Sequence, residues 1–294
     1  MLRAQRSFTK SLEPPHRTRA FLVGDDKLVI TDMWQSWQGS FYLSPEGGQK
    51  SQRVGVNDFG ILRGEEPPID RNKGTGAVYI FGCPLRCKTC YQPEFFGRKA
   101  RMEFSVSDLA RLFLELQREG AATLSIVMAT LQKPVVKALI KAKEMGLSID
   151  CVLNYSGFVS SKDLSEVQDL FEIFVPDVKA LSEKYRKAHA LSEGYTKTAL
   201  EGVRYLAESQ KNLIVRHLVL SPLPDPLSDI RILFDWMNRQ AFRFPLSILT
   251  QYLCPIEKRL FSLSEELLSQ LHELSDQFRV PIFLQGSGDY DYKL

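Results

Sequence analysis

The sequence predicts an α/β protein, a partial (β/α)6 parallel barrel with an irregular N-terminal extension. Two observations lead to this prediction. From Gly74 onward, short apolar runs alternate with segments whose apolar residues recur at helical spacing, as in a parallel sheet wound with helices. Before that point turn-forming and polar residues dominate, as in GVNDFG at 55–60 and GEEPPID at 64–70. Fewer than eight β/α units are visible, so the barrel is expected to be incomplete.

Each element of the barrel follows from a local pattern. The first strand is expected at 76–81 (GAVYIF), and the helix at 105–120 begins at a capping serine, Ser105 or Ser107, and stops at Gly120. The remaining strands are expected at 123–129, 148–154, 171–177, 212–220, 245–252 and 280–284, and the remaining helices at 134–146, 161–170, 196–210, 225–240 and 264–278.

The chain divides by composition into two parts. Residues 1–72 are predicted to be an extension that wraps the main domain, with a possible strand pair in WQSWQGSFYL at 34–43. Residues 73–294 are predicted to form the barrel core together with a C-terminal β/α unit. In such folds the reactive groups sit where strands lead into loops at their carboxyl ends.

Composition excludes several classes of protein. The net charge of +3 comes from 38 basic and 35 acidic residues, without the concentrated basic stripe of a nucleic-acid-binding protein. No apolar stretch approaches the roughly 20 residues that cross a bilayer. Five cysteines are an odd number, and three of them are too closely spaced for mutual disulfides. We therefore expect no nucleic-acid partner, no membrane association and a cytoplasmic location.

Three cysteines form the strongest motif in the sequence. Cys83, Cys87 and Cys90 follow the first predicted strand, so they belong to the loop at its carboxyl end. Thiolates are the soft ligands that zinc and iron-sulfur clusters prefer. A structural zinc site needs four donors, and no fourth donor lies nearby. An iron-sulfur cube held by three cysteines would instead leave one iron open to a substrate or cofactor.

Other cysteines and the histidines have simpler interpretations. Cys151 and Cys254 lie in or near later strands, where small buried hydrophobic residues are common. The imidazoles are interpreted as surface or packing groups rather than ligands; these are His189, His217 and His272.

The C-x3-C-x2-C loop after the first strand of a β/α barrel closely resembles the motif of the radical SAM superfamily. The run GEEPPI before a Gly-rich strand resembles an uncharacterised branch related to pyruvate formate-lyase activating enzyme, over roughly residues 55–255. The resemblance implies a [4Fe-4S] cluster on Cys83, Cys87 and Cys90, with S-adenosylmethionine on the open iron. One departure is Thr89, where the family commonly has an aromatic residue; Tyr91 follows the last cysteine instead.

The resemblance also implies residues that bind the S-adenosylmethionine. The family's Gly-Gly-Glu-like segment after the second strand is replaced here by Met128-Ala129-Thr130, so backbone carbonyls and the Thr130 hydroxyl would have to serve as acceptors. The next strand ends in CVLNYSGF, where the activating enzymes have an acidic residue followed by an Asn-Gly turn. Asn154, Ser156 and Gly157 fall on those positions. The change from Asp to Asn removes a charge, which weakens any cation site there.

Further along the chain, Asp177 and Lys179 resemble an Asp-x-Lys pair that faces the cofactor's carboxylate. Arg216 resembles an Arg that opens the fifth strand and reaches the ribose or carboxylate region, a task that suits a planar guanidinium. Gln251 stands where some relatives have His. We expect Ala129, Thr130 and these residues to contribute to cofactor binding.

The expected function is reductive cleavage of S-adenosylmethionine to a 5'-deoxyadenosyl radical, which abstracts hydrogen from an unknown substrate. The substrate could be a glycyl-radical protein, a small molecule or a peptide. Two non-catalytic alternatives are an iron-sulfur or S-adenosylmethionine-binding barrel and a plain zinc scaffold. An external electron donor of the flavodoxin or ferredoxin type is implied. No residue is identified as the donor of a second hydrogen atom: Tyr91, Tyr155 and Cys254 have suitable chemistry but are interpreted as packing groups.

Overall fold

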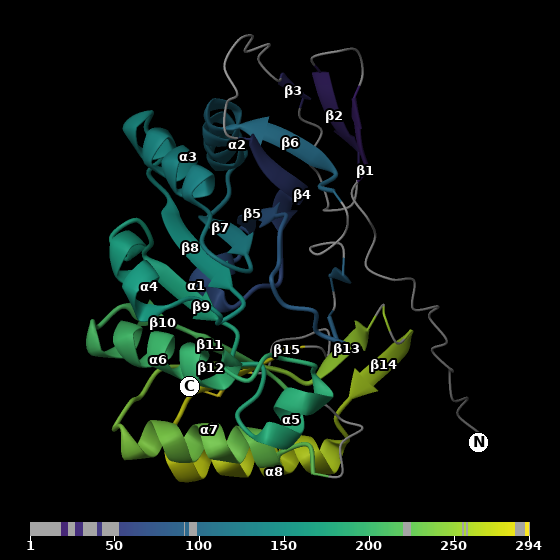
Figure 1. Cartoon of the computed structure of the whole chain (residues 1–294), viewed down its shortest axis with the longest axis vertical. Coiled ribbons are helices and arrows are strands. Elements are labelled where there is room, and N and C mark those ends of the chain that lie inside the picture. The colour runs from purple at the N-terminus through teal and green to yellow at the C-terminus, as the bar shows by residue number, and fades with distance from the viewer. Residues whose placement is uncertain are drawn as a thin grey trace, which may run out of the picture.

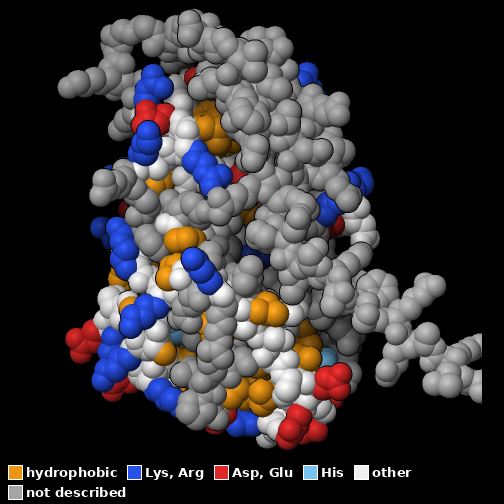
Figure 2. Space-filling view, turned by 90° about the vertical axis from the view of Figure 1, so that its right-hand side faces the viewer, with side chains coloured by type: hydrophobic (Ala, Val, Ile, Leu, Met, Phe, Trp, Pro, Cys, Tyr) orange, Lys and Arg blue, Asp and Glu red, His pale blue; other side chains and the backbone are white. Residues whose placement is uncertain are grey.

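The computed structural model describes residues 19–22, 27–31, 40–42, 53–90, 92–93, 99–219, 225–254, 256, 258–285 and 292–293. In Figure 1 most strands run through the middle of the molecule, the longer helices lie along its left side and lower end, and the remaining strands lie on its right side. No helix in the described ranges is both long enough and apolar enough to span a membrane. On the face shown in Figure 2, Lys and Arg side chains are spread among small hydrophobic groups.

A series of parallel strands forms the centre of the fold and confirms the predicted α/β class. The first four members pair in the order β5 (Thr75–Ile80), β7 (Thr123–Met128), β8 (Asp150–Tyr155) and β9 (Ile173–Pro176). β12 (Leu246–Leu249) and β15 (Ile282–Gln285) end the series. The strand between these two groups changes partner at Ile214: β10 (Asn212–Leu213) pairs with β9, and β11 (Val215–Leu218) pairs with β12.

Backbone contacts join the two sheets across that break. The Ile214 amide donates to the Phe174 carbonyl at 3.0 Å, and the Val178 amide donates to the Arg216 carbonyl at 2.8 Å. Asp177 and Arg216 form a parallel bridge at the same place. The parallel series is therefore continuous from β5 to β15, with the carboxyl ends of the strands on one side.

Helices follow the strands as predicted, with small shifts at their ends. Ser105 caps the first of them, since its Oγ accepts the Asp108 amide at 3.1 Å. The helices that cover the series are α2 (Val106–Arg118), α3 (Lys133–Glu144), α4 (Ser161–Val167), α6 (Tyr195–Glu208), α7 (Ser228–Arg239) and α8 (Glu265–Phe278). The short α5 (Glu183–Ala188) was not predicted.

Part of the expected extension belongs to the main sheet. β4 (Arg53–Leu62) pairs antiparallel with β5 along most of its length and with β6 (Met102–Ser105) on its other side. Its apolar residues Val54, Val56 and Phe59 are buried in the main core. Since residues 53–62 share one sheet with the barrel strands, the predicted boundary between 72 and 73 falls after a core strand rather than before the core.

The GEEPPID segment occupies the amino-terminal end of the strand series. It contains the one-turn helix α1 (Pro67–Asp70), whose Ile69 carbonyl accepts the Thr123 hydroxyl at 2.9 Å, at the first residue of β7. The Ile69 side chain is buried with Val152, Val175 and Ile214, which come from neighbouring strands. This segment therefore packs against the interior of the strand series from the end opposite the cysteine loop.

Two further differences from the predicted elements lie after Leu249 and near the N-terminus. The strand expected at 245–252 ends at Leu249, and after Thr250 the chain enters a hairpin of β13 (Gln251–Cys254) and β14 (Arg259–Ser262). Near the N-terminus, β1 (Arg19–Leu22), β2 (Lys27–Thr31) and β3 (Ser40–Tyr42) form a small antiparallel sheet. The possible strand pair at 34–43 is described only at 40–42, where the partner is β2; β16 (Tyr292–Lys293) pairs with β15.

Candidate active site

A pocket opens at the carboxyl ends of the parallel strands, beside the cysteine loop, and encloses about 830 Å³ of empty space, partly open to solvent. Its wall combines apolar side chains with a few convergent polar and charged groups, as in cofactor sites. Alternating inward positions of the strands lead into it: Val152 lies in the interior cluster and Asn154 in the pocket wall, as a period of two requires. The wall is formed by Cys83, Leu85, Cys87, Thr89, Cys90, Val127, Met128, Ala129, Asn154, Tyr155, Ser156, Asp177, Val178, Lys179, His189, Arg216, His217, Leu218 and Leu249.

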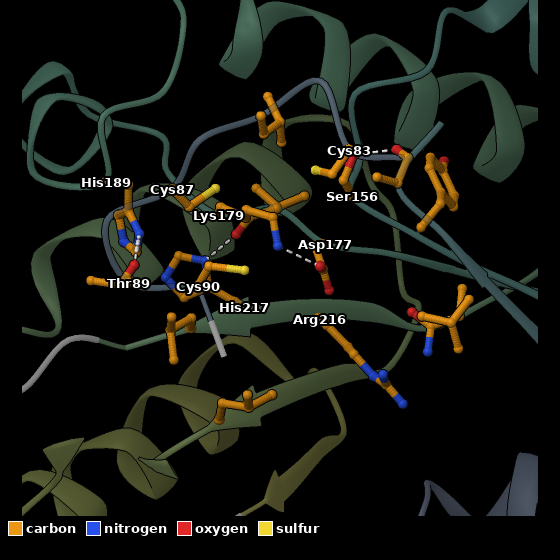
Figure 3. A pocket seen from close by; sticks show the side chains of 18 of the residues that line it. Cys83, Cys87, Thr89, Cys90, Ser156, Asp177, Lys179, His189, Arg216 and His217 are labelled. Carbon is orange, nitrogen blue, oxygen red and sulfur yellow. Dashed lines mark hydrogen bonds and ion pairs between the residues drawn. The ribbon is translucent and has the colours of Figure 1, made fainter. Parts of the chain in front are cut away.

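The three cysteines line this pocket from the loop after β5. Figure 3 shows their sulfur atoms turned toward a common space. Burial raises the pKa of all three thiols, that of Cys90 to about 12. The Lys88 amide donates to the His189 carbonyl at 3.2 Å, which ties the loop to the residue after α5. Within the loop, the Cys90 amide donates to the Cys87 carbonyl at 3.2 Å.

Asp177 and Lys179 form an ion pair inside the pocket. The Lys179 Nζ donates to Asp177 Oδ2 at 2.5 Å, and Figure 3 shows the pair next to the cysteines. Burial disfavours the charged form of Lys179, but the Asp177 carboxylate outweighs it and holds the pKa of the ammonium well above its ordinary value. The pocket therefore contains a fixed positive charge beside three thiols, with its neutralising carboxylate also in the wall.

Arg216 lines the pocket, but its guanidinium is directed elsewhere. Its Nε and Nη2 donate to the two carboxylate oxygens of Glu66 at 2.7 and 2.6 Å, and Nη2 also donates to Glu65. Arg216 is 8% exposed and Glu66 is fully buried. Burial alone would raise the pKa of Glu66, but Arg216 outweighs it and lowers that pKa. The arginine assigned to the cofactor thus ties β11 to the GEEPPID segment.

Ser156 also has a structural partner. Its hydroxyl donates to the Ala129 carbonyl, which links the ends of β7 and β8. The Tyr195 hydroxyl donates to the Asp177 carbonyl at 2.6 Å and accepts the Lys179 amide at 3.0 Å, so it fixes the end of β9 in the same way. These bonds set the spacing of the strand ends that carry Asn154 and Asp177.

Thr89 and two histidines complete the wall. Thr89 Oγ1 and His189 Nδ1 are 2.7 Å apart, and His217 Nδ1 is 2.6 Å from the Val178 carbonyl. Both imidazoles are 1% exposed. Burial, together with the charge of Lys179, lowers the pKa of His189 to about 3, and burial lowers that of His217 as well. The sequence interpretation of these two histidines as simple packing groups overlooked their place in the pocket.

The structure brings most of the sequence-predicted residues together and leaves two apart. Ala129, Asn154, Ser156, Asp177, Lys179 and Arg216 line the pocket with the three cysteines. Thr130 is half-buried and Gln251 begins the β13 hairpin, and neither lines the pocket. The sequence pattern placed Gln251 at the end of the strand predicted at 245–252, because that strand's apolar run continues past Thr250. In the structure the strand ends at Leu249 and Gln251 begins β13.

Other residues considered from the sequence have packing roles. Cys151 is buried in the main core, and Cys254 is buried under the cysteine loop with its Sγ 3.8 Å from the Lys88 carbonyl. Tyr155 is buried in the same main core and reaches the wall of the pocket. His272 lies on α8, and Tyr91 lies outside the described residues.

Comparison with known proteins places this geometry in a family. The family model described as the radical SAM superfamily matches residues 78–233, which include the cysteine loop, Asp177 and Arg216. The chain belongs to the radical SAM superfamily. Among curated proteins it is similar to the pyruvate formate-lyase-activating enzyme of Streptococcus mutans, with 28% identity over 175 residues that cover 55% of this chain and 65% of that protein. The chain thus spans less than two thirds of that relative.

Two solved structures share the fold at low sequence identity. SuiB of Streptococcus suis bound to S-adenosylmethionine superposes with a TM-score of 0.53 and 15% identity, over 71% of this chain and 49% of that chain. A radical SAM methyltransferase from Sphaerobacter thermophilus superposes with a TM-score of 0.54 and 12% identity, over 94% of this chain and 78% of that chain.

Radical SAM membership implies a [4Fe-4S] cluster and S-adenosylmethionine, and the donor set suits both. Within the described part of the chain, no three His, Cys, Asp or Glu side chains converge closely enough to share one metal ion. A cube has a different requirement, because each of its thiolate ligands binds its own iron. Three cysteines on one loop, all of which line one pocket, meet that requirement. In the same pocket, the buried Nε2 atoms of His189 and His217 have no hydrogen-bond partner within the described part of the chain, so both can bind a polar ligand.

Proposed function

We propose that this radical SAM protein is an enzyme that uses a [4Fe-4S] cluster to cleave S-adenosylmethionine reductively and abstracts hydrogen from a substrate. The observation that carries the proposal is the three-cysteine loop at the rim of a pocket that also contains a buried Asp177–Lys179 ion pair. When bound, the two cofactors would supply one-electron chemistry and a 5'-deoxyadenosyl radical, which no side chain can provide.

The protein's own residues would hold the two cofactors, orient them and shield them from solvent. Cys83, Cys87 and Cys90 would hold the cluster, and the raised pKa values of their thiols mean that cluster assembly displaces protons from them. The buried Lys179 ammonium places positive charge where a carboxylate of the cofactor can be attracted, while Asp177 provides an acceptor for an amino group. The backbone at Met128 and Ala129 is fixed by the Ser156 hydroxyl, so its position does not depend on the missing Gly-Gly-Glu-like residues.

Anaerobic reconstitution with iron and sulfide tests this proposal. We expect a brown protein with about four irons per chain that forms 5'-deoxyadenosine from S-adenosylmethionine in the presence of dithionite. Replacing Cys83, Cys87 or Cys90 by Ala should abolish both colour and product, whereas Cys151→Ala, in the core away from the pocket, should preserve both. A colourless protein that binds one zinc, or a brown protein that forms no 5'-deoxyadenosine, would contradict the enzymatic function.

We further propose that the substrate is a protein, in the manner of an activating enzyme, on the basis of the 28% identity to the Streptococcus mutans pyruvate formate-lyase-activating enzyme. A single cluster would then need an external electron donor of flavodoxin or ferredoxin type. Incubating the reduced, cluster-loaded protein with S-adenosylmethionine and pyruvate formate-lyase should produce an organic radical signal in electron paramagnetic resonance spectra. Formation of 5'-deoxyadenosine without such a signal would favour the alternative, a peptide or small-molecule substrate.

A further inference from the structure

The geometry points to His189 and His217 as the residues that recognise the adenine ring of the bound S-adenosylmethionine, with Thr89 setting the orientation of His189. This inference rests on the proposed function and deepens it. Both imidazoles are buried in the pocket wall, and their Nε2 atoms have no hydrogen-bond partner among the described residues. A buried nitrogen without a hydrogen bond is destabilising unless a ligand or water completes it.

The hydrogen-bonding role of His217 follows from its other nitrogen. A carbonyl oxygen can only accept, so at 2.6 Å the Nδ1–H of His217 must donate to the Val178 carbonyl. The ring is neutral in its buried position, and a neutral imidazole carries one proton. The Nε2 of His217 is therefore a bare acceptor in the pocket wall.

His189 has the opposite arrangement. The hydrogen bond to His189 Nδ1 is the only one that Thr89 Oγ1 makes within the described chain. A buried hydroxyl proton needs an acceptor, and Nδ1 is the acceptor within reach among the described residues; we therefore assign the proton of this hydrogen bond to Thr89. The single proton of the neutral ring then sits on Nε2, and His189 is a donor in the same pocket.

An acceptor and a donor side by side define the ligand edge that fits them. The two rings lie near each other, close enough that His217 contributes to the electrostatic environment of His189, and Figure 3 shows both beside Thr89 and Cys90. Adenine presents an exocyclic amino group flanked by ring nitrogen acceptors. The amino group would donate to His217 Nε2, and a ring nitrogen would accept from His189 Nε2. Leu218 and Leu249 add apolar wall suited to the faces of the base.

Equilibrium binding tests the inference without turnover. The cluster-loaded, oxidised protein is titrated anaerobically with S-adenosylmethionine and with its deaminated analogue, in which an oxo group replaces the amino group. His217→Asn keeps an N–H for the Val178 carbonyl but removes the acceptor in the pocket. We expect it to weaken S-adenosylmethionine binding about fivefold, as the loss of one neutral hydrogen bond does, and to abolish the preference of the wild type over the analogue.

Two further variants test the donor. His189→Asn should weaken S-adenosylmethionine binding by a similar factor, and Thr89→Val should do the same because His189 loses its orientation. Thr89→Ser retains the hydroxyl and should bind S-adenosylmethionine with wild-type affinity. His272→Asn, on α8 outside the pocket, is the matched control and should bind normally. Iron content and the visible absorption of the cluster should be unchanged in every variant.

The outcomes distinguish failure of the proposed function from failure of the adenine-binding role of the two histidines. If the cluster-loaded wild type does not bind S-adenosylmethionine, the proposed function fails. If the wild type binds while the His189 and His217 variants bind equally well and keep its selectivity, the inference fails alone. Loss of iron in parallel with loss of binding would also overturn it, because the histidines would then support the cluster loop rather than the base.

Discussion

At the scale of single residues, the buried Glu66–Arg216 pair changes the interpretation of this site most. A guanidinium whose Nε and Nη2 are committed to carboxylates cannot offer those donors to a ligand. Glu65 adds a second acid, and burial opposed by Arg216 leaves its pKa raised. The pair connects the GEEPPID segment to β11 through the interior of the fold, so Arg216 acts as a positioning residue for the strand that carries His217.

Replacing Glu66 by Gln should therefore be costly. It would leave the Arg216 charge with only Glu65 in a buried site, and we expect the free energy of unfolding to fall by about 3 kcal/mol, as when one partner of a buried pair is removed. Urea unfolding of the reconstituted protein measures this change. Glu183→Gln breaks an exposed pair with Lys187 and should have no measurable effect. Equal stability of the Glu66 variant and the wild type would refute the structural role.

His217 also predicts a dependence of stability on pH. Burial lowers its pKa in the folded protein from the ordinary 6.5, so below about pH 6.5 the unfolded chain binds a proton that the folded chain does not. Stability is therefore retained above that pH and lost as the pH falls below it, by at most about 1.4 kcal/mol per pH unit. In urea unfolding between pH 7.5 and 5.5, His217→Asn should show a smaller loss than the wild type. An identical slope in both proteins would contradict a neutral buried His217.

At the scale of elements, the turn from β8 toward α4 depends on one glycine. Gly157 has a φ of +78°, and an added Cβ would overlap the carbonyl oxygen of Asp177. A side chain would thus meet both backbone strain and a neighbouring strand end that Tyr195 holds in place.

Gly157→Ala should consequently destabilise the protein more than an alanine at another positive φ. Gly120 provides the comparison, because its φ is +91° and no atom of the described residues lies within 4 Å of a Cβ added there. Gly120→Ala should lower the free energy of unfolding by about 1 kcal/mol, the ordinary penalty for a left-handed residue, and Gly157→Ala by at least twice that. Thermal unfolding of the two variants measures the difference, and similar melting temperatures would show that Asp177 can move aside.

The elements that the sequence predicted well are those with a local signal. Helical spacing and the Ser105 cap located α2 within two residues, and the apolar strands β7 and β8 were equally clear. β4 was missed because GVNDFG consists of turn formers, and only its pairing with β5 and β6 makes it a strand. The cysteine loop could be located from its spacing, whereas the contacts of Thr89, His189 and Glu66 depend on partners that are 100 or more residues distant in the chain.

At the scale of the whole molecule, the fold closes its two ends differently. The carboxyl ends of the strands carry the cysteine loop and pocket. The amino-terminal end is occupied by the GEEPPID segment, through Ile69 among the interior residues and Glu66 on Arg216. The amino-terminal end therefore depends on residues before Gly74, which composition alone assigns to an extension that wraps the barrel.

Two truncations distinguish a core boundary before residue 53 from one after residue 72. Deleting residues 1–52 leaves β4, Glu66 and α1 in place, so we expect the remaining chain to assemble its cluster and to cleave S-adenosylmethionine without substrate at the wild-type rate. Deleting residues 1–72 removes the antiparallel partner of β5 and both partners of Arg216, which leaves an unpaired sheet edge and a buried charge. That chain should be insoluble or free of iron. Iron content and 5'-deoxyadenosine formation measure the outcome, and a soluble, cluster-loaded 73–294 fragment would restore the boundary that composition indicates.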